Sequence, residues 1–148
     1  MIDTEKQPDL RPISKNKYEL FSDWSYTWQK ENITRRINIT AGFQHDGASI
    51  PRFLWPILGT PDGLIRSAAL VHDFLYQHGG KIPEGAYQQL AFQGHWIDDK
   101  SVWTRKNCDR IFFRIMRECG VSKIKRRTCY HGVRAFGWLF FKKNLSQV

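Results

Sequence analysis

The sequence predicts a small α+β domain, with two or three antiparallel strands in its first third and about four helices behind them. A chain of 148 residues with 41% hydrophobic content can bury one ordinary core and is too short for two independent domains. Aromatic and β-branched residues in partial alternation, typical of strands, occupy the first third. Apolar residues at helical spacing dominate the remainder, so strands are expected first and helices after them.

The amino-terminal third predicts a flexible arm followed by two strands. Residues 1–16 contain two prolines and several charges, which favours a flexible arm in front of a single globular domain over residues 17–148. Residues 18–28 and 35–43 are rich in aromatic and β-branched side chains, which pack well on a pleated surface. These two segments are predicted to pair in a small sheet.

The segment from Asp46 to Pro51 is typical of a tight turn. Gly47 tolerates a positive φ, and Asp46 or Ser49 can accept hydrogen bonds from nearby backbone donors. A short helix or turn is expected next, through residues 53–55. Capping residues and glycine stop signals then predict four longer helices, at residues 62–78, 86–96, 103–118 and 122–143.

The net charge of +9 is concentrated near the carboxyl end, where Lys and Arg crowd residues 105–143. A basic surface attracts polyanions, because binding releases counterions from nucleic acid or places the charge near an anionic membrane. We expect a face that binds nucleic acid, a membrane surface or a host protein, with an ordinary solvated helix face as the alternative. The candidate residues of this face are Lys123, Lys125, Arg126, Arg127, Arg134, Trp138, Lys142 and Lys143.

The cysteines and the apolar segments indicate a cytoplasmic protein. Cys108, Cys119 and Cys129 form no Cys-x-x-Cys unit, so reduced thiols are expected rather than disulfides or a structural zinc site. No stretch approaches the roughly 18 apolar residues of a membrane span. Residues 1–15 are polar and charged, which predicts that no signal peptide is present.

One apolar helix carries a histidine and an aspartate at adjacent positions, His72 and Asp73. Adjacent residues on a helix point about 100° apart, so each of these two side chains needs a partner of its own. Tyr76 shares a face with His72, and Asp109 on the later helix is the expected partner of the imidazole. A carboxylate on one ring nitrogen leaves the other free to take a proton from water, as general-base hydrolysis requires. The alternative is a buried network that only ties two helices together.

The string His72-Asp73-x-x-Tyr76, with Asp109 on a later helix, resembles the catalytic pattern of secretory phospholipase A2. The resemblance implies that His72 is the base, that Asp109 orients it and that Tyr76 supports Asp109. It also implies a divalent cation at Asp73, calcium by analogy, although the glycine-rich calcium loop and flanking cysteines of that family are missing. Asp46 in the turn is a candidate second ligand or substrate contact, with backbone capping as its alternative.

A second pattern resembles the HD-domain metal phosphohydrolases. His45, His72, Asp73 and Asp109 occur in the order of the histidines and aspartates in that family's signature. The resemblance implies a transition metal that activates water for attack on a phosphate ester. Because His45 lies next to a turn after a predicted strand, whereas that family is wholly helical, the phospholipase resemblance ranks first.

The resemblance that covers most of the chain is to a phage and prophage family catalogued as domain of unknown function 1353. It implies a phage or prophage origin, action in the host cytoplasm, and no established activity. The matching segments span roughly residues 40 to 140, and they are Asp46 to Arg52 with Trp55, His72 to Tyr76, Asp109 to Gly120, and Tyr130 to Gly137.

Two functional hypotheses follow from the sequence. The first is a phage-encoded hydrolase in which His72, oriented by Asp109, cleaves an ester or phosphodiester, with phospholipid among the candidate substrates. The second is a non-enzymatic accessory or host-interaction protein whose basic face binds an anionic partner.

Overall fold

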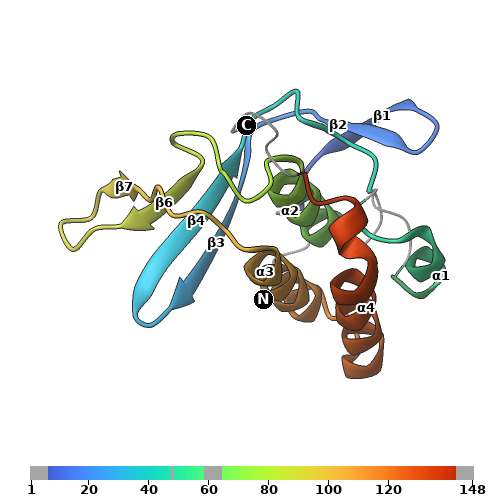
Figure 1. Cartoon of the computed structure of the whole chain (residues 1–148). Helices are drawn as coiled ribbons and strands as arrows, with labels where there is room; N and C mark the ends of the chain where they lie inside the picture. Colours follow the sequence, from blue (N-terminus) through green and yellow to red (C-terminus); the bar gives the residue numbers. More distant parts are fainter. Residues whose placement is uncertain (1–6, 48, 59–64, 143–148) are drawn as a thin grey trace, which may run out of the picture.

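The structure is a computed structural model that describes residues 7–47, 49–58 and 65–142. Across these ranges seven strands form two antiparallel sheets beside the helices, so the α+β class predicted from the sequence is confirmed. Figure 1 shows helix α2 (Arg66–Gln77) near the centre of the molecule, with the other helices and the strands around it. The three cysteine thiols are free.

A three-stranded sheet forms at the amino end, in the order β1 (Leu10–Ser14), β2 (Lys17–Leu20) and β5 (Gln44–His45). Residues 10–14 were expected in the flexible arm and instead pair with β2; residues 1–6 lie outside the described residues. Pro12 fits in β1 because this strand is at the sheet edge and needs no donor on its outer side. The sheet positions His45 opposite Tyr18.

A four-stranded sheet has the order β3 (Trp24–Lys30), β4 (Ile33–Ile39), β6 (Tyr87–Leu90) and β7 (Trp96–Asp98). The prediction of one strand over residues 18–28 is therefore wrong, because the chain breaks after β2 and enters a second sheet at β3. The aromatic rings of β3 stack along one face of this sheet, and the Tyr26 hydroxyl donates to Glu118, the last residue of helix α3 (Arg105–Glu118), at 2.7 Å.

The helix predicted over residues 86–96 is the β6–β7 hairpin instead. Its Ala and Gln content favours a helix only weakly, and pairing with the open edge of β4 outweighs that propensity. Arg36 on β4 donates to Gln88 at 2.8 Å and stacks over the Trp96 ring at 3.9 Å. The hairpin turn closes through Gly94, which has a φ of +87°.

The helices follow the predicted order with different ends. A 3-10 turn (Arg52–Leu54) leads into α1 (Trp55–Leu58), and α3 (Arg105–Glu118) begins after the Thr104 cap. The start predicted near residue 62 lies outside the described residues. The last predicted helix is shorter than expected, because α4 (Lys123–Phe136) ends in a 3-10 turn (Gly137–Leu139). The chain then folds back over α2, where the Lys142 backbone amide donates to the Tyr76 carbonyl at 3.1 Å.

Helix α2 is buried on all sides, from Ser67 to Tyr76. A helix in this position is usually apolar all round, whereas α2 carries His72, Asp73 and Tyr76 among its buried residues. Each polar group must therefore find its partner inside the protein. In the described part of the chain, no helix combines the length and apolar character needed to span a membrane.

The end of α2 is joined to the start of α3 through Gly80 and Trp103. The Trp103 amide donates to the Gly80 carbonyl at 2.9 Å. Gly80 has a φ of +77°, and a Cβ added there would lie 1.8 Å from the Trp103 carbonyl oxygen. This close backbone contact fixes the spacing between the two helices that carry His72 and Asp109.

We expect Gly80→Ala to lower the free energy of unfolding by at least about 3 kcal/mol, because the backbone clash adds to the cost of a left-handed alanine. Gly85→Ala is the matched control, since Gly85 has a φ of +80° and open space around its Cα. Its cost should be about 1 kcal/mol. Urea unfolding of the two variants measures the difference, and equal losses would show that the Gly80–Trp103 contact is not a constraint.

Candidate functional site

His72 and Asp73 point to different sides of α2 and bind different parts of the protein. His72 faces α3, where its Nε2 lies 2.8 Å from Asp109 Oδ1. Asp73 faces the turn after β5, where it meets His45, Gly47 and Ser49. The expectation that each side chain needs its own partner follows from the angle between adjacent helical positions, and both sets of partners are now defined.

Asp109 is fully buried and accepts hydrogen bonds on both carboxylate oxygens. Tyr76 donates to Oδ1 at 2.5 Å, beside His72, and Arg134 donates to Oδ2 at 2.8 Å. Arg105 approaches Oδ2 at 3.4 Å. Burial alone would raise the pKa of Asp109, but the hydrogen bond and charge of His72, with the Tyr76 and Arg134 hydrogen bonds, hold this pKa below its usual value.

Gly137 closes this part of the site from the end of α4. A Cβ at this position would lie 2.6 Å from the Tyr76 hydroxyl and 3.3 Å from Arg105 Nη1. Its φ of −63° is open to any residue, so the constraint is space and not backbone conformation. Only a glycine lets the chain pass directly over the Tyr76–Asp109 pair.

Both ring nitrogens of His72 have partners, because Nδ1 lies 2.8 Å from Ser49 Oγ. The ring is fully buried, with its centroid 4.1 Å from that of Tyr76 and 4.6 Å from that of Phe112. The Ser49 hydroxyl donates to Asp73 Oδ1, so the serine oxygen accepts from His72 Nδ1. In this pattern His72 donates from both nitrogens, which leaves neither of them open to take a proton from water.

Asp73 is also buried, and four donors surround its carboxylate. Oδ2 accepts from His45 Nδ1 at 3.1 Å and from the Gly47 amide at 2.7 Å. Oδ1 accepts from the Ser49 amide at 3.2 Å and from the Ser49 hydroxyl. Burial would raise the pKa of Asp73, but the hydrogen bond and charge of His45, with the Ser49 hydrogen bond, keep this pKa below its usual value.

These donors occupy the directions from which a cation would approach Asp73. Calcium at Asp73 would have to displace His45 or the turn amides, because hard cations bind oxygen ligands and not N–H donors. The predicted second ligand, Asp46, is exposed in the same turn. Among the residues that the structure describes, no group of three or more His, Cys, Asp or Glu side chains is placed to hold a metal ion.

His45 differs from His72 because one of its ring nitrogens has no partner. Nδ1 is held by Asp73, whereas Nε2 is buried without a hydrogen bond to any described residue. Because a carboxylate only accepts, the neutral His45 ring keeps its proton on Nδ1 and a lone pair on Nε2. The sequence predicted this arrangement at His72.

His45 lines a pocket of about 530 Å³ that opens beside α2. His45, Ser49 and Asp73 contribute its buried polar side chains. The exposed part of its wall is formed by Lys17, Gln44, Asp46, Leu139, Phe140 and Lys142. The full lining is Lys17, Gln44, His45, Asp46, Ser49, Asp73, Tyr76, Gln77, Leu139, Phe140 and Lys142.

The predicted basic face is divided by the structure. Lys123, Lys125 and Arg127 are exposed on the first half of α4. Arg134 turns inward to Asp109, so its guanidinium belongs to the buried network. Lys142 lies in the pocket wall, Arg126 stacks over Phe113, and Lys143 is outside the described residues. Trp138 is 62% exposed after α4.

The lowered pKa values of Asp73 and Asp109 predict the acid stability of the fold. Both carboxyls have an ordinary value of 3.8, and the folded protein holds both below it. Their stabilising effect is therefore fully present above about pH 5 and is lost as the pH falls below about 4, because the unfolded chain binds protons first. Chemical denaturation between pH 6 and pH 3 measures the free energy of unfolding. This free energy should fall ever more steeply toward pH 3, where its slope approaches about 2.7 kcal/mol per pH unit, equivalent to the uptake of two protons on unfolding. An unchanged free energy of unfolding across this interval would contradict the assigned pairing.

The comparisons with known proteins place these residues in a family. A family model described as protein of unknown function, DUF1353, matches residues 18–133. The uncharacterized protein y4iH of Sinorhizobium fredii (strain NBRC 101917 / NGR234) is 35% identical over 94 residues. That match covers 62% of this chain and 30% of the relative's length. No solved structure matches the chain. Since the family model spans the turn after β5, α2 and α3, which build the site, the chain belongs to the DUF1353 family of proteins of unknown function.

Proposed function

We propose that this protein is a hydrolase in which His45 activates a water molecule in the pocket beside α2. The observation that carries the proposal is the buried Nε2 of His45, which has no partner among the described residues while Asp73 holds Nδ1. A buried nitrogen acceptor without a hydrogen bond is costly, and a pocket water or substrate would satisfy it. Asp73 fixes the tautomer and stabilises the imidazolium that forms.

The reaction needs one base and one acid, and the same ring supplies both. Nε2 takes a proton from water as the water oxygen attacks the carbonyl or phosphoryl centre of the ester. The resulting imidazolium then gives this proton to the leaving alcohol oxygen, and the neutral ring is restored. The Ser49–His72–Asp109 chain behind Asp73 keeps the carboxylate ionised and in place, as a positioning network.

The pocket lining holds two carboxylates, Asp46 and Asp73, and two lysines with apolar neighbours. We infer an anionic, partly apolar ester from the lysines and the apolar residues. Lys17 and Lys142 supply positive charge, and Leu139 and Phe140 supply apolar surface. Trp138 adds a further exposed aromatic side chain beside them in sequence. A phospholipid combines an acidic headgroup, ester bonds and acyl chains, so it is the substrate class that we propose.

The wild-type protein should hydrolyse at least one of phosphatidylglycerol in mixed micelles, p-nitrophenyl butyrate or bis-p-nitrophenyl phosphate. His45→Asn should lower kcat by at least about 100-fold, because the asparagine amide replaces the Nδ1 donor but offers no base. His95→Asn, which changes an exposed histidine in the β6–β7 turn, should leave kcat unchanged. Full activity in His45→Asn, or an inactive wild type with all three substrates, would contradict the proposal.

Two further variants separate the roles of Ser49 and His72. His72→Asn should lower the free energy of unfolding by about 3 kcal/mol, because it leaves Asp109 and Ser49 without their shared buried partner.

Ser49 should not react covalently with a fluorophosphonate probe in the wild type, since the Gly47 and Ser49 amides bind Asp73 and cannot form an oxyanion hole. Labelling of Ser49 would establish a serine nucleophile and overturn the role given to His45.

A further inference from the structure

A second hollow lies between the four-stranded sheet and α3, separate from the His45 pocket. We call it the sheet–helix groove, and its volume is about 430 Å³. None of its lining residues lines the His45 pocket. They are Trp28, Lys30, Arg35, Tyr87, Ser101, Val102, Trp103, Asn107, Arg110, Ile111, Phe113, Arg114 and Arg117.

The groove is strongly positive, because its lining holds five cations and no carboxylate. Arg110, Arg114 and Arg117 repeat at helical spacing along one face of α3, and Lys30 and Arg35 face them from the sheet. Glu118, outside the lining, accepts from Arg114 at 3.2 Å. These five positive charges repel each other in the free protein. A bound polyanion would relieve this repulsion and be attracted by all five cations.

Aromatic rings line the same groove, with Trp28 and Tyr87 buried and Trp103 partly exposed. Trp28 and Tyr87 are stacked with ring planes 4° apart, and Trp103 packs edge-on against both of them. Two donors of the lining, Trp103 Nε1 and Arg35 Nε, are buried without a partner among the described residues. A ligand with acceptor oxygens would complete them, and a flat ring would extend the aromatic stack.

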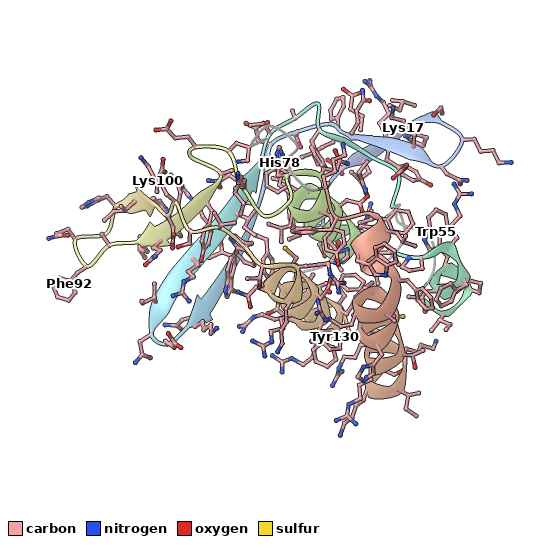
Figure 2. All side chains as sticks on the ribbon, in the orientation of Figure 1. Lys17, Trp55, His78, Phe92, Lys100 and Tyr130 are labelled. Carbon is pink, nitrogen blue, oxygen red and sulfur yellow. The ribbon has the colours of Figure 1, made fainter. Side chains whose placement is uncertain are left out.

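The charged surface continues from the groove onto α4. A neighbouring hollow of about 320 Å³ is lined by Arg110, Phe113, Arg127, Tyr130 and His131, so the two hollows share Arg110 and Phe113. Figure 2 shows Tyr130 among nitrogen-bearing side chains on the outer side of α3 and α4, well away from Lys17. The two hollows together form one track of cationic and aromatic side chains that extends from the four-stranded sheet over α3 to α4.

We propose that this track binds single-stranded nucleic acid. Successive phosphates would meet the arginines, and unstacked bases would lie against the partly exposed rings of Trp103, Phe113 and Tyr130. Non-specific binding of single strands combines these two kinds of contact in general. The preference for Arg over Lys fits this ligand, because a guanidinium pairs with phosphate by two hydrogen bonds and also stacks on bases. An anionic membrane fits less well, since the exposed apolar side chains Trp138, Leu139 and Phe140 line neither hollow.

Fluorescence anisotropy with a labelled 20-nucleotide oligothymidylate tests the proposal at 50 and 200 mM salt. The wild type should bind, with an affinity that falls at least tenfold between the two salt concentrations. Arg110→Ala with Arg117→Ala should weaken binding at least tenfold, and both residues are exposed, so the melting temperature should not change. Arg11→Ala with Lys15→Ala removes the same charge from the β1 side and should change the affinity less than twofold.

Three results would overturn the proposal. The first is an equal affinity of the Arg110→Ala/Arg117→Ala and Arg11→Ala/Lys15→Ala variants for the oligonucleotide. This result would mean that the net positive charge of the protein binds the oligonucleotide without a defined site. The second is tighter binding of a 20-base-pair duplex than of the single strand. The third is equal competition by polyglutamate of matched charge, which would leave no role for the bases or the aromatic rings. Hydrolysis by the His45 pocket is measured separately, so neither outcome there affects this test.

Discussion

Burial of two ionisable side chains at adjacent positions of α2 is the constraint on which the rest of the structure depends. His72 and Asp73 are both buried, so each loses its hydrogen bonds to water. Only hydrogen bonds to other protein groups can compensate for this loss. Their directions require one set of partners on α3 and another on the turn after β5. The Gly80–Trp103 contact, the inward turn of Arg134 and the glycine at position 137 all serve to place or cover those partners.

The same constraint gives two histidines different surroundings. His72 lies between Asp109 and Ser49, and both of its ring nitrogens have partners. His45 lies on the other side of the Asp73 carboxylate and lines a pocket. Only one of its ring nitrogens, Nδ1, has a hydrogen-bond partner among the described residues. Catalytic groups commonly sit where a rigid, satisfied network ends at a cavity, because the network fixes the geometry and the cavity admits the substrate.

Local patterns in the sequence predicted more of the fold than of the site. Helical spacing from residue 105 to 118 and the adjacent His72 and Asp73 were enough to predict α3 and the need for separate partners. The β6–β7 hairpin was not predictable, because its pairing depends on the edge of β4, about 50 residues earlier. The contact of His45 with Asp73 was not predicted for the same reason, because the short strand β5 gives no local signal for it. The turn glycine at position 47 was the one available hint, since its φ of +71° aims an amide at Asp73.

The proposed role of His45 requires that Asp73 holds the Nδ1 proton of the ring and leaves the buried Nε2 as a base. Long-range proton–nitrogen NMR of the histidine rings measures this directly, because protonated and bare ring nitrogens have well-separated shifts. We expect a proton on Nδ1 and a bare Nε2 in the neutral His45 ring. A His45 ring with its proton on Nε2 would mean that the Asp73 contact does not orient a base, and the hydrolase account would then be wrong.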